Sequence, residues 1–322
     1  MLQKVFKFTK NQRFSHPLLG GLFSALLFSF LWRLMGDLAT VFSIIPLFTL
    51  GLMTSAPKHL ATAFGIALLT VALFLSIENA LNYALYVGVP GLVLPYFARQ
   101  HYSEKGKKIW YPLERLVGIL GIYALASTVV LMLVWHFFGI GEKNFETLSS
   151  GLKQAPLEAQ DQVIFLTTYL KLLWPYIPGI SMAVFVFMVA VATSLTPKWF
   201  KAHKVAFPRP LLLLSELYLP WWCWKAFAGV GLAWALVLQL ETSVFQPVFG
   251  NLLAPLVALF TLQGLSVVTT FAKKQKNTQM LLVIFYGFVL VFGWTLLILI
   301  LAGLLEPWLD LRTRLTQRNE KE

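Results

Sequence analysis

Long apolar stretches recur from one end of the chain to the other, and short polar segments separate them. A bilayer core about 30 Å thick needs roughly 20 apolar residues in a helix that rises about 1.5 Å per residue. The pattern predicts an all-α fold, a polytopic transmembrane helix bundle of about nine spans, with eight as the alternative count. The predicted spans are 17–35, 41–56, 60–77, 80–98, 113–138, 173–197, 221–240, 250–272 and 278–304.

These spans divide the chain into five segments. The second span is short for an upright crossing, and its Pro46 and Gly51 favour a bent or tilted helix. The segment 141–172 separates the fifth and sixth spans and mixes polar and apolar residues, as a helix at the outer membrane interface does. The five segments are a basic cytoplasmic amino terminus (1–16), a six-span bundle (17–197), a basic cytoplasmic loop (198–220), three further spans (221–304) and an amphipathic tail (305–322).

Charge supports this topology. Of the 322 residues 58% are hydrophobic and only 12% are charged, which is too few charges to cover a soluble globule of this size. The net charge of +12 lies in short clusters between spans, a pattern typical of cytoplasmic loops rather than of nucleic-acid binding. The clusters are Lys4 to Arg13, Arg99 to Lys108, Lys198 to Arg209 and Lys273 to Lys276.

All four clusters fall on one side of the membrane if the chain crosses as predicted. This favours a multi-pass protein of the inner (plasma) membrane with a cytoplasmic amino terminus. A single crossing after Lys276 then places the tail outside, although Arg312, Arg314 and Arg318 argue against that side.

Motifs for catalysis are absent from the sequence. It contains no Walker-type loop and no HExxH, GxSxG or CxxC pattern. The lone Cys223 has no His or Cys neighbour at metal-ligand spacing, so we interpret it as a small apolar filler. We therefore expect no enzymatic activity, no cofactor and no metal site.

Polar residues near the outer ends of spans are the candidates for ligand binding. Glu78, Asn79 and Asn82 lie within five positions where the third span meets the fourth, and they could converge on a solute. Exposed turn chemistry explains the same residues equally well, and both interpretations stay open. His136, at the outer end of the fifth span, is a further candidate, with a structural role as the alternative.

Small residues at intervals of four predict close contacts between helices. Glycine and alanine let two helix backbones approach, and an amide within a span can hydrogen-bond to a neighbouring helix. The residues expected to pack helices are Gly21, Ala25, Ala61, Gly65, Gln263 and Gly264.

The stretch "GLLEPWLDLRTRL" (Gly303 to Leu315) ends the last apolar segment. Pro307 is suited to the first turn of a helix, and Glu306 places a negative charge near that helix's amino end. Asp310 and Arg314 are spaced to pair on one face. This predicts a short helix that starts near Pro307 and lies on the membrane with Trp308 as its anchor.

Four motifs in the last third of the chain carry a family resemblance. "RPLLLLSELYLPWW" (Arg209 to Trp222), "LFTLQGLSVV" (Leu259 to Val268), "KKQK" and "GLLEPWLDLRTRL" occur in an order that resembles the YybS-like integral membrane proteins, catalogued under a domain of unknown function. Glu306 and Pro307 depart from that family, which more often shows a different acid and no proline.

The first two thirds of the chain are similar to the substrate-binding subunits of energy-coupling-factor vitamin transporters. The similarity rests on "IIPLFTLGLM" (Ile44 to Met53), the basic turn at Lys58 and "HLATAFGIALL". It implies a six-helix bundle, uptake of a small solute and a transmembrane coupling subunit as partner, beside the lipid bilayer. The three extra spans depart from that pattern, and no motif identifies a substrate.

Two main functions therefore stay open at this point, and a lipid-modifying enzyme, which would need a catalytic acid or His facing a cavity, is a disfavoured third. The first is small-solute binding or uptake, with the ligand entering near Glu78, Asn79 and Asn82. The alternative is a non-transporting scaffold that recruits envelope or division partners, which the scarcity of buried charge favours.

Overall fold

The computed structural model describes most of the chain. The described residues are 15–54, 57–104, 107–153, 160–202, 214–240, 245–273, 275 and 277–318. Parts of the predicted basic clusters (residues 1–14, 105, 204, 209, 274 and 276), of the outer segment (154–159) and of the tail (319–322) lie outside these residues.

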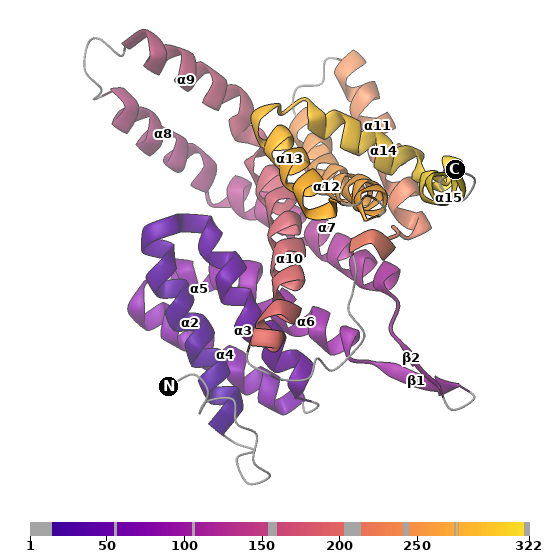
Figure 1. Cartoon of the computed structure of the whole chain (residues 1–322). Helices are drawn as coiled ribbons and strands as arrows, with labels where there is room; N and C mark the ends of the chain where they lie inside the picture. The colour runs from indigo at the N-terminus through magenta and orange to yellow at the C-terminus, as the bar shows by residue number, and fades with distance from the viewer. Residues whose placement is uncertain are drawn as a thin grey trace. The chain divides into compact units, whose positions relative to one another are not determined.

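Helices make up nearly all of the described chain, which confirms the all-α fold class (Figure 1). Within the described residues, seven helical stretches are long and apolar enough to cross a membrane. Three shorter apolar helices accompany them. The long stretches are Leu18–Met35, Pro57–Phe74, Ile77–Ala98, Leu113–Phe137, Asp161–Lys198, Trp221–Gln239 and Gln246–Ala272.

The chain divides into two compact units. Unit 1 consists of Met1–Leu120, Phe187–Leu219 and Leu262–Glu322, and unit 2 of Gly121–Val186 and Pro220–Thr261. Three helices, α7 (Leu113–Phe137), α10 (Ile177–Ala202) and α12 (Gln246–Ala272), contribute residues to both units.

The amino-terminal half of unit 1 is a bundle of apolar helices. The helix α2 (Ser15–Met35) ends at Gly36, whose φ of +55° is a conformation that glycine adopts without strain. The elements that follow are η1 (Gly36–Leu38), α3 (Ala39–Met53), α4 (Pro57–Phe74), α5 (Ile77–Tyr83), the π-helical turn η2 (Ala84–Gly88) and α6 (Val89–Ala98).

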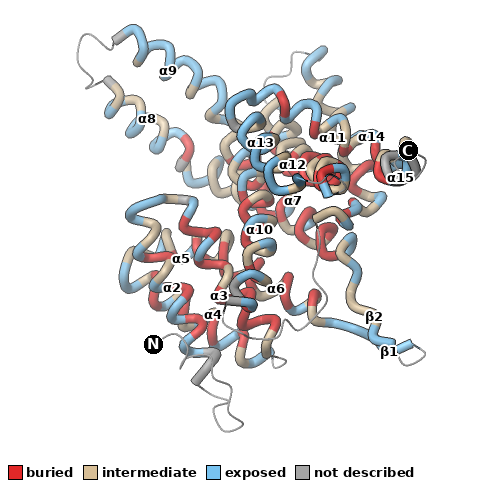
Figure 2. Tube along the Cα trace, in the orientation of Figure 1, coloured by how far each residue is buried: buried red, intermediate tan, exposed pale blue. Residues whose placement is uncertain are grey.

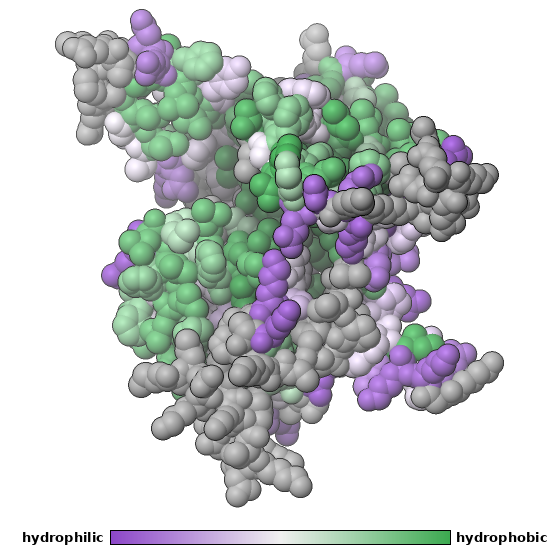
Figure 3. Space-filling model, viewed as in Figure 1, coloured by the Kyte–Doolittle hydropathy of each residue, from purple (hydrophilic) through white to green (hydrophobic). Residues whose placement is uncertain are grey.

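The short helix α3 forms the core of this bundle, since nearly all of its side chains are buried (Figure 2). A polar network ties it to its neighbours: the Ser24 hydroxyl donates to the Ser43 carbonyl (2.6 Å) and lies 2.7 Å from the Tyr83 hydroxyl. The outer faces of α2 and α5 expose apolar side chains, and Figure 3 shows that surface as hydrophobic. Such a surface is stable next to lipid rather than water.

A two-stranded antiparallel hairpin follows α6. Its strands are β1 (His101–Glu104) and β2 (Lys107–Trp110), which pair in the register His101 with Trp110. The sequence predicted no strand here, because both strands are only four residues long and largely polar.

Unit 2 contains the parts of α7, α10 and α12 named above together with α8 (Ile140–Lys153), α9 (Gln160–Leu173), η4 (Trp174–Tyr176) and α11 (Trp221–Gln239). The indole N–H of Trp174 donates to the Gly141 carbonyl at 2.6 Å, which joins η4 to the start of α8. The amide oxygen of Asn251 accepts from the Gly179 N–H at 2.6 Å, and its amide nitrogen donates to the carbonyls of Pro175 and Pro247. These bonds join the amino-terminal ends of α10 and α12.

The carboxyl-terminal part of unit 1 differs from the prediction. Residues 278–304 were expected to form one span, but the structure has two helices, α13 (Thr278–Val291) and α14 (Thr295–Leu309), with a break at Phe292–Trp294. At about 1.5 Å per residue each is roughly 21–23 Å long, too short to cross a bilayer core upright. The last helix is α15 (Leu311–Arg318).

Candidate functional site

An apolar cavity lies within unit 1. Its volume is about 90 Å³, and it is partly open to the surface. Its walls come from α3, α6, α7, α10, η5 (Leu214–Glu216) and α12. The lining residues are mostly aliphatic: Phe48, Leu94, Ala98, Leu113, Leu116, Val117, Leu120, Val189, Ala190, Thr193, Ser194, Leu214, Leu217 and Leu262.

The two hydroxyl groups in the lining are already engaged. Thr193 and Ser194 each donate to the carbonyl of Ala190, one turn earlier in α10. Because these hydroxyls are held against their own helix, the cavity offers its occupant mainly apolar contact.

One wall of the cavity is the segment 214–219, which consists of the 3-10 helical turn η5 and the three residues after it, and this segment runs along the carboxyl-terminal half of α12. The Thr270 hydroxyl donates to the Ser215 carbonyl (3.4 Å), the Ser266 hydroxyl to the Leu217 carbonyl (3.3 Å), and the Leu219 N–H donates to the Gln263 amide oxygen (3.2 Å). Every second residue of the segment thus bonds a residue of α12 that lies three or four positions from the previous one, on one face of that helix.

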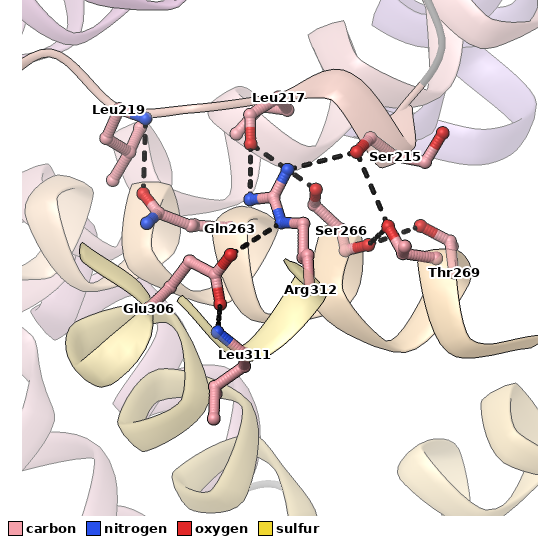
Figure 4. Close-up of polar contacts among 10 residues, drawn as sticks. Ser215, Leu217, Leu219, Gln263, Ser266, Thr269, Glu306, Leu311 and Arg312 are labelled. Atoms are coloured by element: carbon pink, nitrogen blue, oxygen red, sulfur yellow. Dashed lines mark hydrogen bonds and ion pairs between the residues drawn. The ribbon is translucent and has the colours of Figure 1, made fainter. Parts of the chain in front are cut away.

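Arg312 of α15 holds this segment from its other side (Figure 4). Its guanidinium donates to the Ser215 carbonyl (3.0 Å) and to the Leu217 carbonyl (2.7 Å). Its Nε lies 3.0 Å from a carboxylate oxygen of Glu306, and the guanidinium carbon Cζ lies 4.1 Å from the centroid of the Tyr218 ring. Four contacts therefore converge on one side chain that is only 4% exposed.

Glu306 is the partner of Arg312 and is itself 1% exposed. Its second carboxylate oxygen accepts from the Leu311 N–H at 3.1 Å and so caps the start of α15. The sequence predicted that a helix starts near Pro307, which is wrong: α14 continues through Pro307 to Leu309, and the break falls at Asp310, whose φ is +44°. We refer to Glu306 and Arg312, with the Ser215 and Leu217 carbonyls, as the carboxyl-terminal lock.

Burial opposes both charges of this pair. It raises the pKa of the Glu306 carboxyl, while the nearby Arg312 acts in the opposite direction. It lowers the pKa of the Arg312 guanidinium, and Glu306 again opposes the shift. Each charge thus depends on the other, because a lone ion in this position has almost no access to water.

The lock also constrains topology. Thr270, before α13, and Arg312, after α14, both bond the carbonyl of Ser215. The end of α12 and the start of α15, on either side of the α13–α14 pair, therefore meet at one residue. Residues of the tail are thus in direct contact with the end of the segment 198–220, while the side of the membrane on which the tail lies stays a prediction.

Gln263 and Gly264 lie beside the lock. The Gln263 side chain is 1% exposed and binds the Leu219 backbone. A Cβ atom at Gly264 would lie 2.0 Å from the carbonyl oxygen of Leu299, so α12 and α14 are in backbone contact at this glycine.

The small residues of α2 and α4 divide into two groups. A Cβ at Gly21 would lie 2.2 Å from the Ala63 carbonyl oxygen, and Ala25 is fully buried on the same face. Ala61 and Gly65, in contrast, are exposed, and nothing lies within 4 Å of a Cβ built at Gly65. The reason is helical geometry: Ala61 is two residues from the buried Ala63 and so points to the opposite side of α4.

The predicted ligand residues lie apart from the cavity. Ser76 caps α5, since its hydroxyl accepts from the backbone N–H and the side-chain amide of Asn79. Glu78 is exposed in the first turn of the same helix, and Asn82 is half-buried one turn later. Asn79 thus takes part in the exposed turn chemistry that was one of the two interpretations, and none of the three lines the cavity.

His136 lies in unit 2, at the end of α7, and its exposed ring contacts the ring of Phe137. It therefore belongs to a different unit from Glu78, Asn79 and Asn82. Among the described residues, no group of three or more His, Cys, Asp and Glu side chains could hold a metal ion. Cys223 is buried on α11.

The lock was not predicted from the sequence. Glu306 and Arg312 are six positions apart, a spacing that places two residues on different faces of a continuous helix. Only the break at Asp310 turns the two side chains toward each other.

A comparison with known protein families identifies the family of this chain. A family model described as "Predicted membrane protein (DUF2232)" matches residues 21–306. The chain belongs to this family. In this DUF2232 member the match spans the cavity lining and ends at Glu306 of the lock. No curated protein and no solved structure matches the chain. The resemblances to YybS-like proteins and to energy-coupling-factor subunits stay predictions.

Proposed function

We propose that this membrane protein binds a small apolar or amphiphilic molecule, such as the alkyl chain of a lipid, in the cavity of unit 1. The observation that carries the proposal is a cavity of about 90 Å³ whose lining is mostly apolar. An engineered apolar cavity of about 150 Å³ stays dry and binds benzene, so a space of the present size takes a few carbon atoms of a larger molecule.

The lock supports this function because it fixes one wall of the cavity. Leu214 and Leu217 line the cavity, and Arg312 holds the carbonyl of Leu217 from behind. A binding site is selective when its walls are held in place before the ligand arrives. The similarity to energy-coupling-factor subunits adds small-solute uptake and a transmembrane coupling subunit as further parts of the proposal.

Photolabelling in a bilayer tests the proposal. The full chain in nanodiscs is irradiated with a diazirine-bearing fatty acid, and labelled peptides are located by mass spectrometry. We expect adducts on the segments around Leu116 and Val189, which line the cavity from α7 and α10.

A matched pair of variants sharpens the test. Ala190→Phe fills the cavity, and Val191→Phe adds the same ring at the next position of α10, which is exposed. The first variant should remove the adducts and the second should keep them. Adducts that persist in Ala190→Phe, or that never form on the cavity lining, would contradict the proposal.

A second function, the non-transporting scaffold, has one observation in its favour. The helix α9 exposes a series of large apolar side chains, and Figure 2 shows α8 and α9 as largely exposed. These side chains are Ile164, Phe165, Leu166, Tyr169, Leu172 and Leu173. Site-specific crosslinking from Phe165 in native membranes would support a scaffold if it captured one defined membrane protein, and would count against it if only lipid were captured.

A further inference from the structure

The hairpin β1–β2 is tied closely to the membrane. It joins α6, the end of the candidate span Ile77–Ala98, to α7, which begins the span Leu113–Phe137. Only two residues lie between each helix and its strand, and the Tyr111 N–H donates to the Gln100 carbonyl, which extends the ladder to the helix ends. At about 3.3 Å per residue, strands of this length reach roughly 13 Å, so every part of the hairpin lies near the lipid headgroups.

The two faces of the hairpin differ in charge. Directly opposed residues share a face, and faces alternate along each strand. One face carries His101, Ser103, Lys108 and Trp110, which we call the cationic face because it has no acid. The other carries Tyr102, Glu104, Lys107 and Ile109, where Glu104 opposes Lys107 and balances its charge.

Aromatic rings accompany the positive charges at the base of the hairpin. The rings of His101 and Trp110 lie 4.9 Å apart on the cationic face, and Phe97 and Tyr111 lie 5.6 Å apart where the hairpin meets the helices. Trp and Tyr with basic residues are typical of the headgroup level of a bilayer. Figure 3 shows the hairpin as largely hydrophilic with an apolar patch.

Arg99 adds a further hydrogen-bond donor at the base of the hairpin. The Nη1 of Arg99, the residue that ends α6, is enclosed by the protein and has no hydrogen-bond partner among the described residues. Burial lowers the pKa of this guanidinium. The Arg99 side chain as a whole is only partly buried, so the guanidinium can bond a phosphate oxygen, which is a strong acceptor for it.

We propose that the hairpin lies on the membrane with its cationic face toward anionic lipid headgroups, and that Arg99 binds a headgroup phosphate at its base. This goes beyond the ligand cavity, since it assigns a separate surface and a separate partner. Charge complementarity selects the partner, because each basic residue near an anionic surface adds about fivefold to the binding equilibrium.

Spin labels on the two faces test this orientation. The full chain carries Cys223→Ser, which removes the native thiol, and either Ser103→Cys on the cationic face or Tyr102→Cys on the other face. Each labelled protein is placed in nanodiscs of phosphatidylcholine with or without phosphatidylglycerol, and accessibility to a water-soluble relaxation agent is measured. Phosphatidylglycerol should lower the accessibility of position 103 severalfold and leave position 102 accessible.

Charge variants separate this interaction from simple proximity. Lys108→Glu should abolish the effect of phosphatidylglycerol at position 103, whereas Lys107→Glu on the other face should preserve it. Arg99→Gln should weaken the effect of phosphatidylglycerol at position 103. Equal accessibility of position 103 in both lipids, protection of position 102 instead, or the same protection produced by inorganic phosphate without anionic lipid would overturn the proposal.

Discussion

The carboxyl-terminal lock allows a quantitative test of how unit 1 is held together. Arg312→Ala removes one ion pair, two hydrogen bonds to backbone carbonyls and the contact with the Tyr218 ring. It also leaves the Glu306 carboxylate, which is 1% exposed in the native chain, with the Leu311 N–H as its one remaining partner among the described residues. Breaking a buried pair by removing one member costs about 3–5 kcal/mol, and we expect a loss of unfolding free energy in that range.

Thermal unfolding of the full chain in mild detergent measures the loss. At about 2.1 cal/mol/K per residue, the 322-residue chain has an unfolding entropy of about 0.7 kcal/mol/K. One kcal/mol then shifts the midpoint by about 1.5 °C, so Arg312→Ala should lower it by roughly 4–7 °C. Arg314→Ala is the matched control, because Arg314 lies two residues away on the same helix and is exposed. Its removal should change the midpoint by little, as surface substitutions do.

A double-mutant cycle isolates the interaction itself. Glu306→Gln and Arg312→Met each leave a buried partner behind, whereas the double variant leaves no uncompensated charge. The double variant should therefore be more stable than the sum of the two single losses predicts. The reasoning is refuted if Arg312→Ala and Arg314→Ala unfold at the same temperature, or if the two single losses simply add.

Three further predictions concern packing and capping, each measured by the same unfolding assay. Gly264→Val should lower the unfolding free energy by several kcal/mol, because the added Cβ meets the Leu299 backbone. Nothing lies near a Cβ built at Gly65, so Gly65→Ala should leave the unfolding free energy unchanged or raise it by up to about 1 kcal/mol through helix propensity. Equal effects of the two substitutions would contradict the observed packing. Ser76→Ala removes the cap of α5 and should cost about 1 kcal/mol, with Ser76→Asn restoring it. Asn251→Leu should lower the unfolding free energy by a few kcal/mol, since three backbone groups, of which the Gly179 N–H is buried, lose their bond to the amide. An unchanged midpoint would show that those bonds contribute nothing.

The positions of the long helices could be predicted from the sequence because lipid imposes a simple requirement on length and apolarity. The fifth predicted span, 113–138, corresponds to α7 at Leu113–Phe137, and the seventh, 221–240, to α11 at Trp221–Gln239. The requirement says little about shorter elements. The hairpin β1–β2 has four-residue strands made of charged and aromatic residues, so neither an apolar run nor an alternating pattern marks it.

The candidate site was harder to predict because polarity alone does not separate a ligand residue from a structural one. Asn79 has the polarity of a binding residue but bonds the cap of its own helix. The cavity is lined by aliphatic residues that look like any other core position in the sequence. What distinguishes them is the empty volume between helices, and that depends on tertiary packing.

The break between α13 and α14 bears on the side of the membrane predicted for the basic tail. Residues 278–304 are apolar throughout, so hydropathy gave no sign of the break at Phe292–Trp294 and predicted a single crossing. A single crossing places a tail with several arginines outside, whereas basic residues are usually retained in the cytoplasm. Arg312 bonds the carbonyl of Ser215, so the start of the tail contacts the end of the segment 198–220. If this contact holds in the membrane and that segment is cytoplasmic, as its lysines predict, then Arg314 and Arg318 lie on the same side and the conflict disappears.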